Sequence, residues 1–201
     1  MIVRVKKCAI IFLAIVFFAG CVSTASLPNL RPDGEAAEKG KGEFVELNNG
    51  TIIDGDITKV SLATLLALKK VGNVTLNGTK YGYKEINAFQ KEGKYYRKDA
   101  YNYFNERIVK GKINVYRSFH TGQSVNSKGM SHSFSYYLHY LQKGDTEKVV
   151  AFELKVLKKM IQDYEPAVEE FNKYDALSKK EKKFKGDNYL DNVIYTYNNR
   201  N

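Results

Sequence analysis

The sequence predicts an α+β fold, in which an antiparallel β-sheet of short strands and hairpins is followed by two C-terminal helices packed on it. Short runs of alternating apolar and polar residues recur between residues 43 and 143, and Asn-Gly or Glu-Gly pairs separate several of them. Beyond Gly144 the apolar residues change to spacings of four and three, which is typical of amphipathic helices. Helices covering one side of an antiparallel sheet would bury both kinds of apolar face.

The first 20 residues have the layout of a secretory signal peptide. Three basic residues lie among the first seven positions, and an apolar run from Cys8 to Ala19 follows. This run is too short to cross a bilayer comfortably, since a spanning helix needs about 20 apolar residues. We therefore expect residues 1–20 to be removed, which leaves 181 of the 201 residues.

The residues that precede Cys21 resemble the lipobox of bacterial lipoproteins. They read Phe17-Phe18-Ala19-Gly20-Cys21, and the two phenylalanines are bulkier than the Leu and Ala or Ser usual there. The resemblance implies that the Cys21 thiol receives a diacylglyceryl group and that acyl chains such as palmitate anchor the mature N-terminus. Each buried methylene contributes about 0.8 kcal/mol, so two or more chains give stable attachment. The alternatives are a plain secretory signal, with Cys21 incidental, and an uncleaved N-terminal anchor.

The mature chain divides into a tether and one domain. Residues 21–42 read as a lipidated N-terminus and flexible tether, because prolines and glycines occur there without a sustained apolar period. Residues 43–201 form a single α+β domain, β-rich over 43–143 and helical over 145–201. Neither an Asp resembling an inner-membrane retention signal nor an acidic export run follows Cys21. These features favour a cell-envelope protein on the outer membrane, facing the periplasm.

The domain opens with a predicted hairpin between 43–47 and 51–57, around Asn48-Asn49-Gly50. A two-residue turn pairs Val45 with Asp54, whereas a three-residue loop with Gly50 at positive φ pairs Val45 with Ile53. The second register gathers the apolar residues on one face, so we prefer it. The aspartates of Asp54-Gly55-Asp56 lack the spaced oxygen ligands of a calcium loop, so we expect no metal there.

The next segments read as an ambiguous stretch and two hairpins. Ser61–Lys70 is ambiguous in sequence: Ser61 could cap a short helix, which Gly72 would end. Hairpins follow around Asn77-Gly78 and around Glu92-Gly93.

A long strand and its partner complete the predicted sheet. The strand covers Arg107–Phe119, and its partner covers Ser133–Gln142, which alternates aromatic and polar residues. The connection from His120 to His132 is rich in Gly, Ser and Asn and reads as a long, mobile loop.

The helical part begins after Gly144, with Asp145 as the expected N-cap. Pro166 removes a backbone donor, so we expect a kink or a break near Tyr164, and the constant phase of the stripe favours a kink. Ser178–Lys185 reads as a basic, solvated loop, and a final helix starts at Asp187. The stripe comprises Val150, Leu154, Leu157, Ile161, Tyr164, Val168 and Phe171.

The charge of the chain limits its partners. The net charge is +10, and three of the basic residues lie in the expected signal peptide. Outside the cytoplasm the available anions are lipid head groups and acidic glycans, so we expect no nucleic acid partner. The basic run either contacts an anionic surface, with Phe184 at the interface, or only solvates a loop. That run contains Lys179, Lys180, Lys182, Lys183, Phe184 and Lys185.

Few residues have the spacing that catalysis or metal binding requires. His120 and His132 bracket the long connection and could meet at the base of a hairpin, so they are weak catalytic candidates for an envelope hydrolase. No zinc motif, GxSxG elbow, SxxK motif or phosphate loop occurs, and we expect no metal and no cofactor. The only cysteines are Cys8 and Cys21, so the mature body has no disulfide and no thiol nucleophile.

The body also resembles small lipoproteins of Bacteroidetes-type bacteria, in the segments 49–57, 89–96 and 111–116. That resemblance brings no activity or site residue with it. The sequence therefore favours a membrane-anchored envelope lipoprotein acting as a non-enzymatic binding or scaffolding module. One alternative is an accessory binder of glycan or of another anionic envelope polymer, in which tyrosines such as Tyr95 and Tyr101 stack on sugars. The other is the hydrolase using the His120–His132 region.

Overall fold

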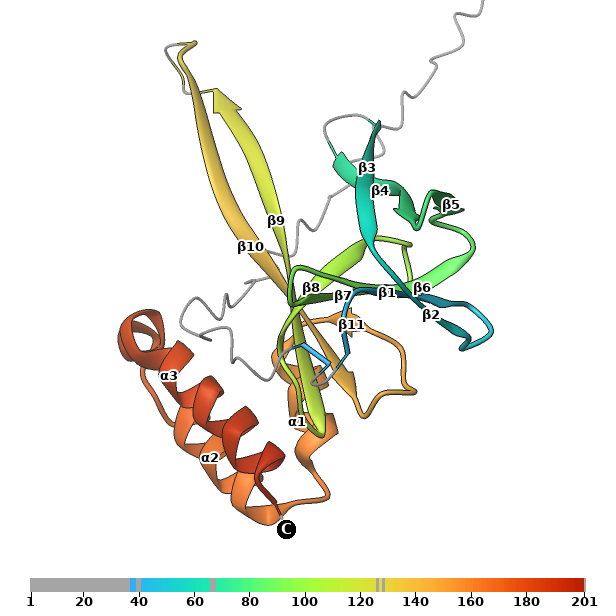
Figure 1. Cartoon of the computed structure of the whole chain (residues 1–201). Helices are drawn as coiled ribbons and strands as arrows, with labels where there is room; N and C mark the ends of the chain where they lie inside the picture. Colours follow the sequence, from blue (N-terminus) through green and yellow to red (C-terminus); the bar gives the residue numbers. More distant parts are fainter. Residues whose placement is uncertain (1–36, 39–40, 66–67, 126, 128, 201) are drawn as a thin grey trace, which may run out of the picture.

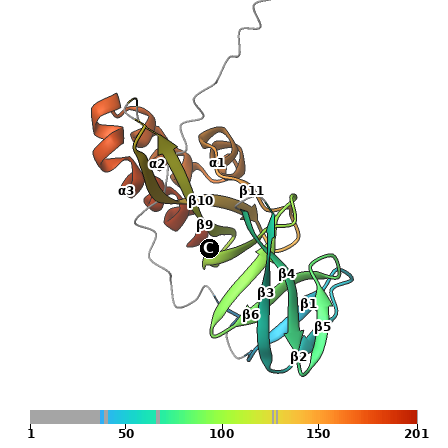
Figure 2. The ribbon, with the colours of Figure 1, turned by 90° about the horizontal axis from the view of Figure 1, so that it is seen from above.

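The computed structural model describes residues 37–38, 41–65, 68–125, 127 and 129–200, and their side chains except those of 62–71. It confirms the α+β fold, with two antiparallel sheets and three C-terminal helices (Figure 1). The helices lie at one end of the large sheet and the small sheet lies at the other (Figure 2).

The large sheet has eight strands in the order β11-β10-β9-β8-β7-β6-β1-β2. All of its neighbouring strands run antiparallel. The strands are β1 Phe44–Leu47, β2 Ile52–Asp54, β6 Ile86–Lys91, β7 Lys94–Lys98, β8 Phe104–Val109, β9 Ile113–Val125, β10 Ser131–Lys143 and β11 Val150–Ala151.

The first hairpin has the preferred register. Val45 pairs with Ile53, and the Leu47 amide donates to the Thr51 carbonyl at 2.8 Å. Gly50 has a φ of +84°, a conformation that glycine adopts at little cost.

The small sheet consists of β3 Ile57–Leu65, β4 Leu68–Leu76 and β5 Thr79–Gly82. The helical interpretation of Ser61–Lys70 is therefore wrong, because these residues pair across a hairpin from Ile57↔Leu76 to Leu65↔Leu68. This hairpin packs on the β1 and β6 end of the large sheet. The shared core contains Val45, Ile57, Val74, Leu76, Ile86 and Phe89.

The predicted single strand over Arg107–Phe119 is divided in two. β8 ends at Val109, a turn covers Lys110 to Lys112, and β9 starts at Ile113. The two strands then pair antiparallel, with Val109 opposite Val115. Gly111 interrupts the alternating pattern at this turn, and that was the sequence signal for a hairpin.

The predicted mobile loop between His120 and His132 is also wrong, because most of it extends β9 and β10 as one long hairpin. The pairing runs from Ile113↔Lys143 to Val125↔Ser131. Residues 118–125 and 131–138 form the outer part, here called the aromatic arm, which projects away from the helices (Figure 1). Within the described residues, no other strand pairs with the arm along either edge.

The helices are α1 Leu154–Ile161, α2 Glu165–Asp175 and α3 Lys179–Asn198. The expected helix start at Asp145 is wrong, because Val150 belongs to β11 and α1 begins at Leu154. Pro166 lies in the first turn of α2, so the stripe is broken rather than kinked, which gives three helices instead of two.

The helices bury their apolar residues against β8, β9 and β10, as the sequence predicted. The strands contribute Ile108, Ile113, Val115 and Leu141, and the helices contribute Leu157, Ile161, Ala167, Phe171, Tyr174, Leu190, Val193, Ile194 and Tyr197.

The predicted basic loop over Ser178–Lys185 is helical from Lys179 onward. The Ser178 hydroxyl accepts from the Glu181 amide at 3.3 Å, and the Glu181 carboxylate accepts from the Ser178 amide at 3.0 Å. This capping box starts α3 eight residues before the predicted Asp187. The chain spacing Ser-x-x-Glu was present in the sequence.

Part of the predicted tether lies against the large sheet. The buried side chain of Gln90 accepts from the Glu38 amide at 2.7 Å and donates to the Lys41 and Gly42 carbonyls at 3.0 Å each. Glu38, Lys41 and Gly42 therefore lie at the sheet face that carries Phe44 and Tyr95.

Candidate functional site

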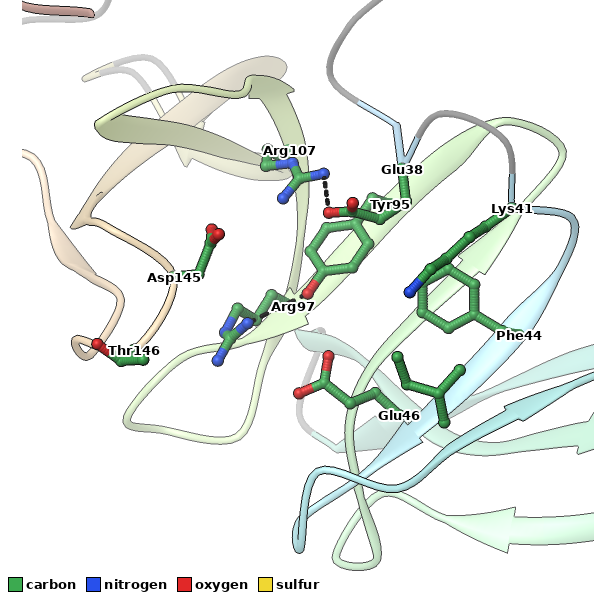
Figure 3. Close-up of a pocket in the computed structure, with 10 residues that line it drawn as sticks. Glu38, Lys41, Phe44, Glu46, Tyr95, Arg97, Arg107, Asp145 and Thr146 are labelled. Carbon is green, nitrogen blue, oxygen red and sulfur yellow. Dashed lines mark hydrogen bonds and ion pairs between the residues drawn. The ribbon is translucent and has the colours of Figure 1, made fainter.

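A cavity of about 440 Å³, here called the arginine cavity, opens on this sheet face (Figure 3). Strand alternation directs Glu46 of β1, Tyr95 and Arg97 of β7, and Arg107 of β8 toward it, because residues two apart share a face. Its lining residues are Glu38, Lys41, Phe44, Glu46, Ile52, Tyr95, Arg97, Arg107, Asp145 and Thr146.

Arg107 is the buried cation of the arginine cavity, with a side chain only 1% exposed. Its guanidinium donates to the Glu38 carboxylate at 2.8 Å and lies 4.0 Å from the centre of the Tyr95 ring. The Lys110 ammonium contacts the second Glu38 oxygen at 2.7 Å. Partial burial opposes ionisation of Glu38, but Lys110 and Arg107 outweigh it and lower the pKa of that carboxyl.

Arg97 has fewer partners than Arg107. Its guanidinium donates to the Tyr95 hydroxyl oxygen at 3.2 Å, and within the described part of the chain no carboxylate lies at ion-pair distance from it. Two acidic neighbours are engaged elsewhere: Glu46 accepts from Asn87 at 2.7 Å, and Asp145 accepts from Asn114 at 3.0 Å. Arg97 therefore keeps donors available to the cavity.

The aromatic arm carries a stacked row of rings on one face. His120, Tyr136 and Phe134 stack in succession, with ring centres 5.6 Å and 5.8 Å apart. The Phe134 ring lies over Gly122, where a Cβ atom would come within 2.5 Å of it. On the opposite face, Phe119 meets the Tyr137 ring edge-on at 5.4 Å.

These rings are unusually exposed for an aromatic cluster. A partner of matching chemistry could bury them. The large apolar side chains of the arm that are exposed are Phe119 at 59%, Val125 at 68%, Phe134 at 49%, Tyr136 at 43% and Tyr137 at 44%.

A second cavity, of about 320 Å³, lies at the base of the arm and is called the aromatic cavity. Its buried acid, Asp99, is already satisfied, because one oxygen accepts from the Tyr101 and Tyr103 amides and the other from the Asn105 side chain. The cavity therefore offers ring faces, hydroxyls and an imidazole. Its lining residues are Asp99, Tyr101, Tyr103, Phe104, Ser118, Phe119, His120, Thr121, Tyr140 and Ala151.

His120 and His132 are not brought together. His120 pairs with Tyr136 and His132 pairs with Ser124, so they are separated by four strand positions, or roughly 13 Å. The expected meeting at a hairpin base fails because both lie within strands. Instead, His120 Nε2 lies 2.7 Å from the Ser118 hydroxyl, within the aromatic cavity.

The Ser118–His120 pair places a hydroxyl and an imidazole at hydrogen-bond distance, as activation of a serine nucleophile requires, and burial lowers the pKa of His120. Among the described residues, no carboxylate contacts His120 to orient it. Their spacing of two on a strand could have revealed the pair from sequence.

The basic run lies in the first two turns of α3. Phe184 is 71% exposed, and the Lys183 ammonium lies 5.9 Å from its ring centre. Lys182 instead extends over the Tyr174 ring at 4.9 Å and donates to the Asp175 carbonyl. Among the described residues, no other polar contact marks the start of α3 as a binding site.

Cys21, the signal peptide and most of the tether lie outside the described residues. Within those residues, no cluster of three or more His, Cys, Asp or Glu side chains forms a metal-binding group. The described helices include none with the length and apolar character needed to cross a bilayer.

Comparison of the chain with protein-family models, curated proteins and solved structures finds no match. The candidate sites are therefore argued from their own geometry.

Proposed function

We propose that this protein is a lipid-anchored, non-enzymatic binding module of the cell envelope, and that its ligand is a glycan. The observation that carries the proposal is the exposed row His120-Tyr136-Phe134, which leads into the aromatic cavity. The anchor rests on Cys21 and the lipobox resemblance, and the outer membrane facing the periplasm is the proposed location.

A glycan fits the mixed chemistry of the arm. Sugar rings have apolar C–H faces that pack on aromatic rings, and their hydroxyls require neutral hydrogen-bonding groups nearby. The arm alternates rings with Ser, Thr and Gln side chains, and its residues 118–125 and 131–138 include no Lys, Arg, Asp or Glu. An uncharged saccharide segment matches this surface better than an anionic polymer does.

A bilayer fits the same arm less well. The outer backbone edges of the arm have no strand beside them among the described residues. Unpaired amide and carbonyl groups cost several kcal/mol each in hydrocarbon, so the arm is unsuited to insertion.

The glycan proposal is tested by titrating soluble oligomers of N-acetylglucosamine into the mature protein. We expect Tyr136→Ala and Phe134→Ala each to weaken binding about tenfold, because each removes one stacking platform. Tyr195→Ala and Phe184→Ala are matched controls, since both side chains are 71% exposed but lie on α3. Equal affinities across all four variants would contradict the proposal, as would binding of the arm to lipid vesicles instead.

An envelope hydrolase is the alternative function, and the Ser118–His120 contact of 2.7 Å favours it. It requires the N-acetyl groups of the bound oligomer to be hydrolysed, because a Ser–His pair attacks acyl carbons, whereas cleavage of the glycosidic bond uses two carboxylates. Release of acetate by the wild type, abolished in Ser118→Ala, would replace the binding module by an enzyme.

The anchor is tested by growing cells with a clickable fatty acid. We expect wild-type protein to be labelled and Cys21→Ala to be unlabelled, because the thiol is the acylated atom in the proposal. Labelled Cys21→Ala protein would rule out this anchor.

A further inference from the structure

We propose that the arginine cavity is a second binding site, which takes the carboxylate of a small ligand, and that Glu38 is an internal competitor for it. The inference is separate from the proposed glycan site, because the arginine cavity and the aromatic cavity share no lining residue.

The size of the arginine cavity suits a small ligand. Its volume of about 440 Å³ falls within the range of small-molecule pockets, which runs from roughly 300 to 1,000 Å³. Phe44 and the Tyr95 ring provide apolar wall (Figure 3), and Ile52 also lines the cavity, so a compact ligand with an acid group can be covered there.

Arg97 provides the primary contact. It is half-buried, and the only hydrogen bond of its guanidinium among the described residues is to the Tyr95 hydroxyl. A guanidinium has five N–H donors in a planar fork, and a carboxylate can accept two of them in parallel. Partial desolvation strengthens that contact relative to one on an open surface.

Tyr95 supports the same contact from its buried position. Burial raises the pKa of Tyr95 to about 12, so the hydroxyl remains protonated at physiological pH. Its oxygen accepts from Arg97, which leaves its own O–H available as a donor to an oxyanion.

Glu38 already demonstrates that this face accepts a carboxylate. Its two oxygens contact Arg107 at 2.8 Å and Lys110 at 2.7 Å, and the segment that carries it is attached through Gln90. Glu38 neutralises the cations next to Arg97 and so lowers the attraction for a second anion. Removing its charge should therefore strengthen binding of an external carboxylate.

The experiment is a calorimetric titration of the mature protein with N-acetyl-alanyl-alanine and with glucuronate, which present a peptide and a sugar carboxylate. Inorganic phosphate is titrated as an anion of different shape. We expect at least one carboxylate to bind, Arg97→Gln to weaken it about tenfold or more, and Glu38→Gln to strengthen it several-fold. Lys80→Gln, a charge change at an exposed position of β5, should leave the affinity unchanged.

Each outcome decides a part of the proposal. Equal binding of N-acetyl-alanyl-alaninamide, equal affinity in Arg97→Gln, or a preference for phosphate over both carboxylates would overturn the carboxylate site. No binding to either wild type or Glu38→Gln would do the same. If Glu38→Gln binds the carboxylate with the same affinity as wild type, Glu38 does not compete with the external ligand.

Arg97 lies in a strand, so its replacement needs a check on folding. Arg97→Lys keeps the charge but lacks the planar fork, and we expect an intermediate affinity with an unchanged circular dichroism spectrum. The gain expected for Glu38→Gln does not depend on any change at Arg97.

Discussion

Asp191 on α3 has one carboxylate oxygen buried without a hydrogen-bond partner among the described residues. Burial, with a further contribution from Asp187, raises the pKa of Asp191 from 3.8 to about 6. Between these values the folded protein binds a proton that the unfolded chain has released. The contribution of Asp191 to the free energy of unfolding is therefore most favourable below pH 3.8. It decreases as the pH rises through about 6.

Replacing Asp191 with asparagine should remove this pH dependence. We expect Asp191→Asn to be more stable than wild type at pH 7.5, by about 1 kcal/mol after allowance for solvent screening. Urea denaturation at pH 4 and at pH 7.5 measures the difference, and Asp54→Asn on exposed β2 is the control. A gain of the same size at both pH values would refute this explanation.

Residue spacing could have revealed part of the site, but not its centre. Ser118 and His120 are two apart on a strand and share a face, but the predicted strand ended at Phe119, so the pair was not predicted. Arg97 and Arg107 meet at one cavity only because β7 pairs with β8, and Glu38 contacts Arg107 from 69 residues away in sequence. Such pairing joins residues that are distant in sequence. The residues around Arg97 and Arg107 do not distinguish them from the other arginines of the chain.

Among the elements, the aromatic arm depends on one glycine. A Cβ at Gly122 would come within 2.5 Å of the Phe134 ring, so Gly122→Val should push that ring out of its stack on Tyr136. We expect this variant to bind the glycan as weakly as Phe134→Ala does, with an unchanged melting temperature, because the arm lies outside the buried clusters.

The control for this variant is Gln123→Val, which adds a β-branched residue at the next strand position without facing the Phe134 ring. Both variants are measured by oligomer titration and by thermal unfolding. If Gly122→Val binds like wild type, the stacked row is not the binding surface.

Local signals predicted hairpins well and longer elements less well. Gly50 and the alternation around it were enough for the register of β1 and β2. The segment over Ser61–Lys70 has leucines at helical spacing, yet pairing across the β3–β4 hairpin overrides that local preference. Ser178 and Glu181 had the spacing of a capping box, but the density of lysines around them favoured a loop.

For the molecule as a whole, the change at Gly144 correctly separated most strands from the helices, and their packing against the sheet followed from the apolar stripe. The second sheet was not predicted, because its strands fold back on β1 and β6 through contacts between segments distant in sequence. Only the outer part of the arm, between His120 and His132, was read as a mobile loop, because Gly, Ser and Asn interrupt its alternation.

The unpaired edges of the arm have a consequence for how densely these molecules can be crowded. Open β edges recruit other strands, and proteins usually protect them with charges, prolines or bulges. The arm has few such residues, so the arms of neighbouring copies held close together can pair edge to edge. Local concentration, rather than the strength of any single contact, then limits how many copies remain dispersed.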